Sequence, residues 1–88
     1  MKIAAILLNR NLPSVTDKLY HLIKNKNKDF IDVFIVDAGS DKKKISKNTT
    51  WRANWKSVKK KGLRYGRGMN FGLIQLWKEN TFDNYDEF

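Results

Sequence analysis

The stretch DVFIVDAGSD, residues 32–41, joins an apolar run to a short polar turn. Val33 to Val36 are β-branched or aromatic residues, a composition that is typical of strands. The run stops at Asp37, and the glycine and serine that follow allow the backbone to turn sharply. In an open α/β sheet, ligands bind outside the carboxyl ends of the strands, where the loops diverge. The stretch therefore predicts a strand that leads directly into a candidate binding loop.

Two earlier segments place this strand in a β-α-β unit. Residues 3–8, IAAILL, are apolar without alternation, as in a strand buried on both faces of a parallel sheet. Residues 11–23 predict a helix, with Asn11 as its cap and Pro13 in its first turn. Its apolar residues recur at helical spacing, at Leu12, Val15, Leu19, Leu22 and Ile23. The second strand, residues 30–36, is then parallel to the first, with a right-handed crossover.

The second half of the sequence is less regular. Residues 42–68 show no clear period, and we expect a loop there with a short strand near residues 56–60. Residues 69–78 predict an amphipathic helix. Its expected inner face consists of Met69, Leu73, Leu76 and Trp77. Residues 81–88, TFDNYDEF, read as the lead into another strand.

The length and the absence of repeats favour one structural unit. A chain of 88 residues is too short for two sizeable cores, and no low-complexity linker interrupts it. We therefore expect residues 1–88 to form a single α/β domain with a parallel sheet. There are no cysteines, which excludes disulfides and thiolate metal sites.

Membrane insertion and secretion are not expected. The apolar run at residues 3–8 is shorter than the hydrophobic part of a secretory signal, which spans about 7–15 residues. No segment approaches the ~20 apolar residues of a membrane-spanning helix. The sequence thus predicts a soluble, cytoplasmic protein.

Positive charge is concentrated in the middle of the chain. The formal net charge is +9, and residues 42–67 contain eleven Lys or Arg and no acidic residue. Such a field attracts phosphates, whether in nucleic acid, on an anionic surface or in a nucleotide. A solvated surface without any ligand is the plain alternative.

The ends of the two strands supply the first candidate site residues. Asn9, Arg10 and Asn11 follow the first strand and should adjoin Asp37, because the ends of paired parallel strands lie side by side. The Asp37 carboxylate could accept hydrogen bonds from a base or a ribose hydroxyl, or it could simply close a turn. Arg10 could stack on a base or pair with a phosphate, or it could be an exposed arginine at a helix start.

Residues 62–73, GLRYGRGMNFGL, form a glycine-rich entry to a helix. This is not a dinucleotide-binding fingerprint, since that motif follows the first strand of its domain. Free N–H groups at a helix start nevertheless favour a phosphate. Gly72 could instead only permit close helix packing.

The aromatic residues of the basic segment leave another function open. Trp51, Trp55 and Tyr65 lie among cations and could stack on the bases of a single-stranded nucleic acid. They could equally cover a sheet. A small basic nucleic-acid-binding module is therefore the alternative function, although we do not expect nucleic acid as the partner. A receiver-like domain is not favoured, because the first strand ends in LLNRN without acidic residues.

The order of these features resembles the N-terminal half of family 2 glycosyltransferases, inverting enzymes with a GT-A fold. The first strand ends in LLNRN, the second in IVDAGSD, and GRGMNFGL follows the basic segment. The similarity spans nearly all 88 residues, and IVDAGSD is the most specific of its motifs. It implies a Rossmann-like start of a three-layer sandwich, truncated before the metal-binding strand.

The resemblance also implies which residues touch a donor nucleotide. Leu8, Asn9 and Arg10 match the loop that lies against the base, and Asp37, Ala38 and Gly39 match the turn that contacts it. Gly68, Asn70 and Gly72 match the element near the ribose and diphosphate. Many relatives have an aromatic residue in place of Leu8 and Asp or Asn in place of Ala38. Both differences remove a side-chain contact and leave the identity of the nucleotide open.

The implied ligand is a nucleotide-diphospho-sugar, with UDP, GDP or dTDP as the nucleotide part, and the acceptor is not indicated. In the family, the acidic metal motif and the catalytic base lie further downstream. Mn²⁺ or Mg²⁺ is therefore expected only in a longer parent protein, and Asp86 and Glu87 are not assigned as its ligands. We expect no catalytic residue among these 88 and no activity of this portion alone. The first strand would have an open edge, which favours self-association.

Overall fold

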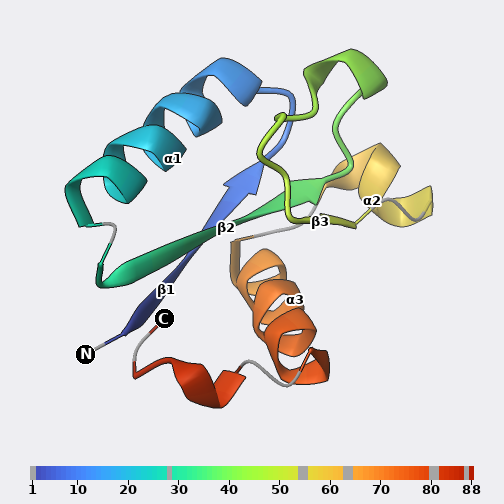
Figure 1. The fold of residues 1–88 in the computed structure, drawn as a ribbon. Helices are drawn as coiled ribbons and strands as arrows, with labels where there is room; N and C mark the ends of the chain where they lie inside the picture. The colour runs from blue at the N-terminus through green and yellow to red at the C-terminus, as the bar shows by residue number, and fades with distance from the viewer. Residues whose placement is uncertain (1, 28, 54–55, 63–64, 80–81, 87) are drawn as a thin grey trace.

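The computed structural model describes residues 2–27, 29–53, 56–62, 65–79, 82–86 and 88. They form a three-stranded parallel sheet with helices, a small α/β fold (Figure 1). The strands are β1 (Ile3–Asn9), β2 (Ile31–Ala38) and β3 (Trp51–Ala53). The helices are α1 (Pro13–Asn27), α2 (Lys56–Lys61) and α3 (Tyr65–Lys78), with short 3₁₀ turns η1 (Lys42–Lys44) and η2 (Phe82–Asn84).

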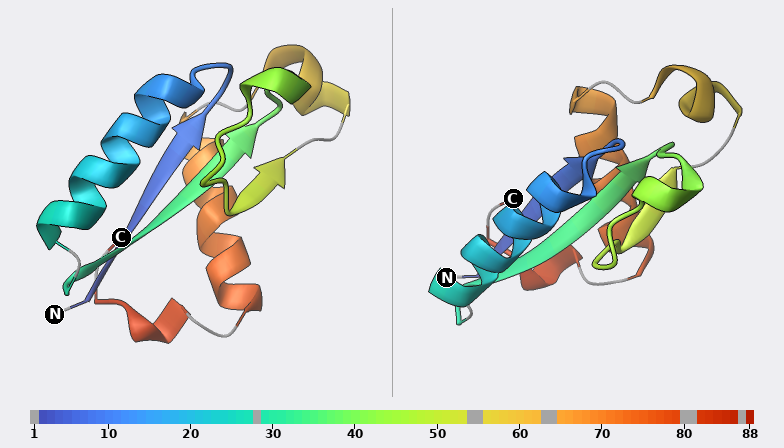
Figure 2. Two further views of the ribbon diagram at one scale, coloured as in Figure 1. Left: turned by 45° about the horizontal axis from the view of Figure 1, so that its top comes forward. Right: turned by 90° about the horizontal axis from the view of Figure 1, so that it is seen from above.

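The predicted β-α-β unit is confirmed. β1 and β2 pair in parallel over their length, with Ile3 opposite Ile31 and Asn9 opposite Asp37. β3 pairs in parallel with the last part of β2, so that the strand order is β1-β2-β3. The helices α1 and α3 lie on opposite faces of this sheet (Figure 2). All three strands consequently point their carboxyl ends toward one edge of the molecule.

The main core lies between β1, β2 and α3. Ala4, Ile6, Val36 and Leu76 are buried there together. Gly72 faces β1 so closely that an added Cβ would come within 3.0 Å of the Ile6 Cδ1 atom. This contact matches the interpretation of Gly72 as a residue for close helix packing.

The prediction of a strand near residues 56–60 is wrong, because these residues form α2. Val58 is the apolar residue of this lysine-rich segment, and its side chain is buried. A single helical turn can bury one side chain and leave its neighbours in water, whereas a strand would need a longer apolar face. The additional strand is β3, which begins at Trp51. The helix predicted at residues 69–78 begins earlier, at Tyr65.

The two long helices bury their apolar stripes incompletely. On α3 the inner face is confirmed for Leu76, and Met69 and Leu73 are half-buried, but Trp77 is 72% exposed. The expectation for Trp77 is therefore wrong, because Trp77 lies about 100° around the helix from the buried Leu76. On α1 three residues of the apolar stripe are exposed by 43–63%, namely Val15, Leu19 and Leu22, and Leu12, directly before the helix, is exposed as well.

The C-terminal segment returns to the beginning of the sheet (Figure 2). Residues 82–86 and 88 contain the turn η2 and no strand, and residues 81 and 87 lie outside the described part of the chain. The Tyr85 hydroxyl donates a hydrogen bond of 2.8 Å to the Asp32 carboxylate on β2. This segment therefore packs against the amino ends of the strands. Among the described residues, no helix has the length and apolar character needed to span a membrane.

Burial raises the pKa of Tyr85 to about 12, and the hydrogen bond and negative charge of Asp32 act in the same direction. An unfolded tyrosine ionises near pH 10, so this pair stabilises the fold fully below pH 10. We expect the stabilisation to be lost as the pH rises from about 10 to about 12. Absorbance titration should show one of the three tyrosines ionising late, and Asp32→Ala should move that transition toward pH 10.

Gly39 combines a left-handed backbone with a lack of space. Its φ is +74°, and an added Cβ would lie 2.5 Å from the Val58 carbonyl oxygen. Gly39→Ala should therefore lower the free energy of unfolding by about 2 kcal/mol or more, measured by urea denaturation. Gly66→Ala is the matched control, since a Cβ there meets nothing within 4 Å. It should leave stability unchanged or raise it by up to about 1 kcal/mol.

Candidate functional site

The candidate site lies at the carboxyl ends of the strands, where the loops after β1 and β2 meet. Strand register places Asn9 directly opposite Asp37. Both side chains are buried, with exposures of 1% and 0%. A buried polar side chain must have hydrogen-bond partners, so the contacts of this pair determine how both loops are held.

Asn9 is the centre of the polar cluster. Its amide nitrogen lies within hydrogen-bond distance of Asp37 Oδ1 at 3.1 Å, the Lys44 carbonyl at 3.2 Å and Ser40 Oγ at 3.4 Å. Its amide oxygen accepts from the backbone N–H of Leu12 and from the Thr16 hydroxyl. One side chain thus connects β1, the start of α1, the end of β2 and η1.

Asp37 closes the turn after β2. Its Oδ1 accepts from Asn9, and its Oδ2 accepts from the backbone N–H of Ser40 at 3.0 Å. Because the carboxylate is fully buried, it does not face solvent in this conformation. The arrangement corresponds to the turn-closing interpretation of Asp37. A ligand approaching this end of β2 would meet the turn's backbone before this side chain.

Arg10 holds α2 against the strand ends. Its guanidinium donates to the backbone carbonyls of Val58 at 2.9 Å, Ala38 at 3.3 Å and Lys59 at 3.4 Å. It also lies where a Cβ of Gly62 would be, at 2.2 Å from Nη1. The guanidinium therefore occupies the carbonyl end of α2, where a cation is stabilised. In this structure it contacts protein backbone.

Asn11 joins the same two loops from the other side. It has a positive φ of 59°. Its backbone N–H donates to Ser40 Oγ at 2.9 Å, and its side-chain oxygen accepts from the Asp41 N–H at 2.7 Å. The side chain predicted to cap α1 is thus used to fix the loop after β2.

The residues of the glycine-rich segment divide between two sides of α3. Gly68 faces β1, where an added Cβ would lie 2.4 Å from Leu8 Cδ2. Asn70 is exposed, and it lies about 200° around the helix from both Gly68 and Gly72. The structure therefore brings Leu8 and Gly68 together next to the strand ends. It does not bring Asn70 into the buried cluster of Asn9 and Asp37.

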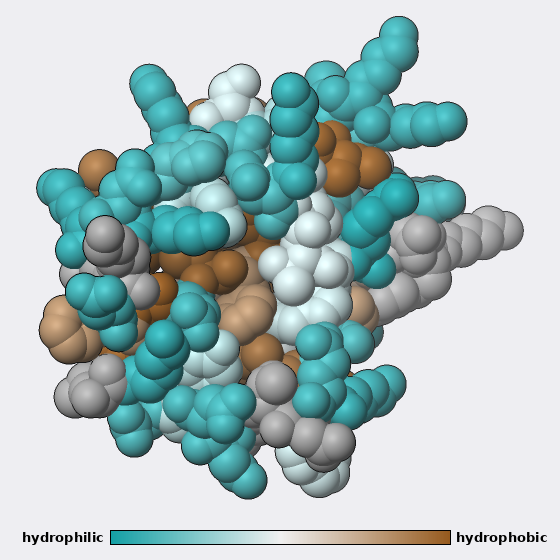
Figure 3. Space-filling view, viewed as in Figure 1, coloured by the Kyte–Doolittle hydropathy of each residue, from teal (hydrophilic) through white to brown (hydrophobic). Residues whose placement is uncertain are grey.

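A basic hollow opens beside the turn after β2. It has a volume of about 350 Å³ and is lined by Gly39, Ser40, Asp41, Lys42, Arg52 and Lys59. Its three basic residues are exposed, and hydrophilic side chains extend from this upper part of the molecule in Figure 3. Three cations against one carboxylate give the hollow an excess of positive charge, which would attract an anion.

Sequence reasoning did not single out the three cations of this hollow. The charge of residues 42–67 was evident, but the charged side chains come from η1, β3 and α2. Arg52 lies opposite Asp37 because β3 pairs with the end of β2. Placing β3 correctly would have revealed that Arg52 lies beside Asp37. The sequence instead predicted a strand near residues 56–60, after the position of β3.

Another polar cluster fixes the loop between η1 and β3. The Asp17 carboxylate on α1 accepts from the Ser46 hydroxyl and, at 3.0 Å, from the Asn48 amide. Thr50 adds bonds to β2, since its hydroxyl accepts from the Ile35 N–H at 3.1 Å and its own N–H donates to the Ile35 carbonyl at 2.9 Å. The basic loop is consequently tied down at both ends.

Of the three aromatic residues considered for base stacking, Trp51 packs on the sheet. Its ring stacks on Phe34 with a centroid distance of 5.2 Å. Its indole N–H donates to the Glu79 carboxylate at 2.7 Å. Trp55 and the side chain of Tyr65 lie outside the described part of the structure. Trp51 thus matches the interpretation of an aromatic residue that covers the sheet.

Comparisons with known proteins add no family to this geometry. No protein-family model, no curated protein and no solved structure matches the chain. The resemblance to family 2 glycosyltransferases therefore stays a prediction from sequence motifs.

Asn9→Ala tests whether the polar cluster holds the two loops. The substitution removes the partner that Asn9 provides to Asp37 Oδ1 and one of the two acceptors of the Thr16 hydroxyl, which keeps the Leu12 carbonyl. We expect a loss of about 2–4 kcal/mol in the free energy of unfolding, measured by urea denaturation. Asn70→Ala, on an exposed helical position, should change it by no more than about 0.5 kcal/mol. Equal effects of both variants would contradict the assigned role of Asn9.

Proposed function

We propose that this chain binds a nucleotide-diphospho-sugar at the carboxyl ends of its strands, as the N-terminal portion of a GT-A glycosyltransferase. The observation that carries the proposal is the basic hollow beside the locked loops of β1 and β2. In open α/β sheets this is the edge at which ligands bind. The sequence resemblance supplies the ligand class, and the geometry supplies a compatible location.

The charge of the hollow suits a diphosphate. Lys42, Arg52 and Lys59 approach from three different elements, with Asp41 as the opposing charge. Arginine and lysine form strong, charge-assisted hydrogen bonds with phosphate oxygens. A volume of about 350 Å³ falls at the lower end of the range for small-molecule pockets, about 300–1,000 Å³. A diphosphate with part of a ribose would fill this space.

The residues implied by the resemblance take different parts in this proposal. Asn9, Arg10, Asp37 and Gly39 hold the loops, and thereby set the shape of the hollow. The backbone after Asp37, including Ala38, is left to meet the base. Since neither Leu8 nor Ala38 offers a polar side chain, we expect weak discrimination among nucleotide bases.

The resemblance implies that Gly68, Asn70 and Gly72 lie near the ribose and diphosphate, but none of the three lines the basic hollow. The two glycines act by letting α3 approach β1, and Asn70 is exposed and open to a ligand. The described residues contain no group of three or more His, Asp or Glu side chains that could hold a metal ion. The proposal concerns binding and assigns no catalytic step to this chain.

The experiment is a binding titration with UDP, GDP and dTDP, followed by calorimetry or amide chemical shifts. We expect saturable binding and shifts at residues 39–42. Arg52→Gln should weaken the affinity by about tenfold, because one charge-assisted phosphate contact is lost. Lys26→Gln is the charge-matched control, since Lys26 lies in the last turn of α1, at the other end of the molecule. It should leave the affinity within about twofold.

A nucleic-acid-binding module predicts a different result from the same titration. Binding of a single-stranded oligonucleotide would weaken steeply as salt increases, with a slope set by the number of phosphates contacted. Arg52→Gln and Lys26→Gln would then have similar effects, because the whole basic surface would contribute. That outcome, without saturable nucleotide binding, would contradict the proposal.

A further inference from the structure

The carboxyl end of the sheet carries more cations than the basic hollow uses. Seven exposed cations from η1, β3 and α2 form what we call the basic end, namely Lys42, Lys43, Lys44, Arg52, Lys59, Lys60 and Lys61. Three of them line the hollow. The other four do not line it, and we call them the outer lysines: Lys43, Lys44, Lys60 and Lys61. The site described above therefore leaves these four charges without a role.

Hydrogen bonds to the strand ends hold both segments that carry the outer lysines. In η1, the Lys44 carbonyl oxygen lies 3.2 Å from the amide nitrogen of Asn9 at the end of β1. In α2, the carbonyls of Val58 and Lys59 accept from the guanidinium of Arg10. Figure 2 shows η1 and α2 beyond the tips of β1 and β2. The backbone of the basic end is thus fixed by the protein, while its cationic side chains stand in solvent.

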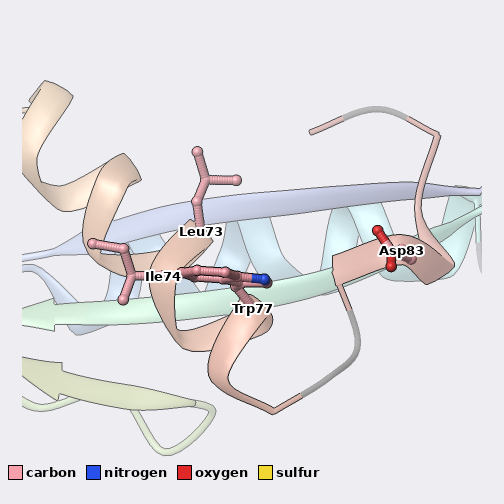
Figure 4. Close-up of a pocket in the computed structure, with 4 residues that line it drawn as sticks. All are labelled: Leu73, Ile74, Trp77 and Asp83. Carbon is pink, nitrogen blue, oxygen red and sulfur yellow. The ribbon is translucent and has the colours of Figure 1, made fainter.

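Few acidic groups balance the charge of the basic end. In the part of the chain that the structure describes, none of its cations forms an ion pair, and the ion pair found there joins Lys2 to Asp32 at the amino end of the sheet. Asp41 is the carboxylate that lines the hollow. Asp86 bonds to the Lys2 N–H, and Figure 4 shows Asp83 on η2, also toward the amino ends of the strands. The positive field is therefore concentrated at one end of the molecule.

The side chains of the basic end suit a lipid surface better than a nucleic acid. Six of the seven cations are lysines, which are compact, hydrated point charges without a fixed contact geometry. Arginine, which binds phosphate through two parallel hydrogen bonds, occurs once. Among the described side chains of residues 39–62, the aromatic ring is that of Trp51, and it stacks on Phe34. These side chains therefore offer no platform for the base stacking that single-stranded nucleic acids use.

The distribution of the lysines over two separate segments also favours an extended partner. A ligand in the hollow of about 350 Å³ reaches the three cations that line it. A plane of anionic headgroups can lie against η1 and α2 at the same time. Clusters of about four to eight Lys or Arg are typical of proteins that bind anionic lipids. The basic end, with its seven cations, falls within this range.

We infer that the basic end docks on the surface of an anionic lipid bilayer, with the carboxyl ends of the strands toward the headgroups and the amino ends away from them. The outer lysines supply attraction to the lipid phosphates and carboxylates in addition to that of the three cations in the hollow. The inference does not rest on the proposed nucleotide binding, because the outer lysines do not line the hollow.

The test is co-sedimentation of the 88-residue chain with phosphatidylcholine vesicles in which about one lipid in three is phosphatidylserine. Binding should be saturable, should weaken as the salt concentration rises, and should be absent with pure phosphatidylcholine vesicles. Replacing all four outer lysines by Gln should weaken it about 100-fold or more, since each lysine near an anionic surface contributes about fivefold in affinity.

The charge-matched control replaces four exposed lysines on α1 and α3 by Gln, namely Lys18, Lys24, Lys26 and Lys78. Both variants have a net charge of +5, which is nine minus four. The control should lose no more than about fivefold in affinity, because its lysines lie outside the basic end. A third variant with Arg at the four outer positions keeps the charge and should bind within about threefold of the unaltered chain. Circular dichroism of each variant checks that it is folded.

Three results would overturn the inference. Equal losses in the outer-lysine variant and the charge-matched control would mean that net charge, and not the basic end, drives binding. Equal binding to pure phosphatidylcholine vesicles would exclude recognition of anionic lipid. Binding of a single-stranded oligonucleotide, without vesicle binding at the same salt concentration, would identify nucleic acid as the partner of this end.

Discussion

The hydrogen bond between Asn9 and Asp37 is the constraint on which the rest of this structure depends. Both side chains are buried at the ends of adjacent parallel strands, where register places them opposite each other. A buried carboxylate and a buried amide are costly unless each finds a partner, and here each is a partner of the other. The remaining atoms of the pair then bind Ser40, Lys44, Leu12 and Thr16. Two strands, a helix start and two loops are thereby fixed around one pair.

The candidate site is a consequence of that arrangement. With the loop after β2 held by Asp37, Gly39 adopts its left-handed conformation and allows the backbone of α2 to approach. Arg10 then bonds to the exposed carbonyls of α2 and keeps it there. The cations of three elements are brought around one hollow. Buried polar residues thus shape the hollow, while exposed charged residues give it an excess of positive charge.

Both long helices leave apolar side chains exposed. The apolar stripe of α1 and part of the outer side of α3 are exposed, and both stand beside the open edge of β1. In a three-layer α/β fold, helices on the two faces bury their apolar sides against the sheet between them.

The sequence alone determined the β-α-β unit, the helix after the glycine-rich segment, and the meeting of Asn9 and Asp37, because strand length, helical period and parallel register are local or nearly local properties. It left two roles open for Asp37 and Arg10. The tertiary structure decided between these roles, because the Asp37 carboxylate and the Arg10 guanidinium form hydrogen bonds with residues that are distant in sequence. It also decided the position of β3 and the conformation of α2, because a lone Val58 among lysines carries no periodic signal and its burial depends on the tertiary fold. The basic hollow could not be predicted for the same reason: its cations come from three elements, and only pairing of β3 with the end of β2 brings them together.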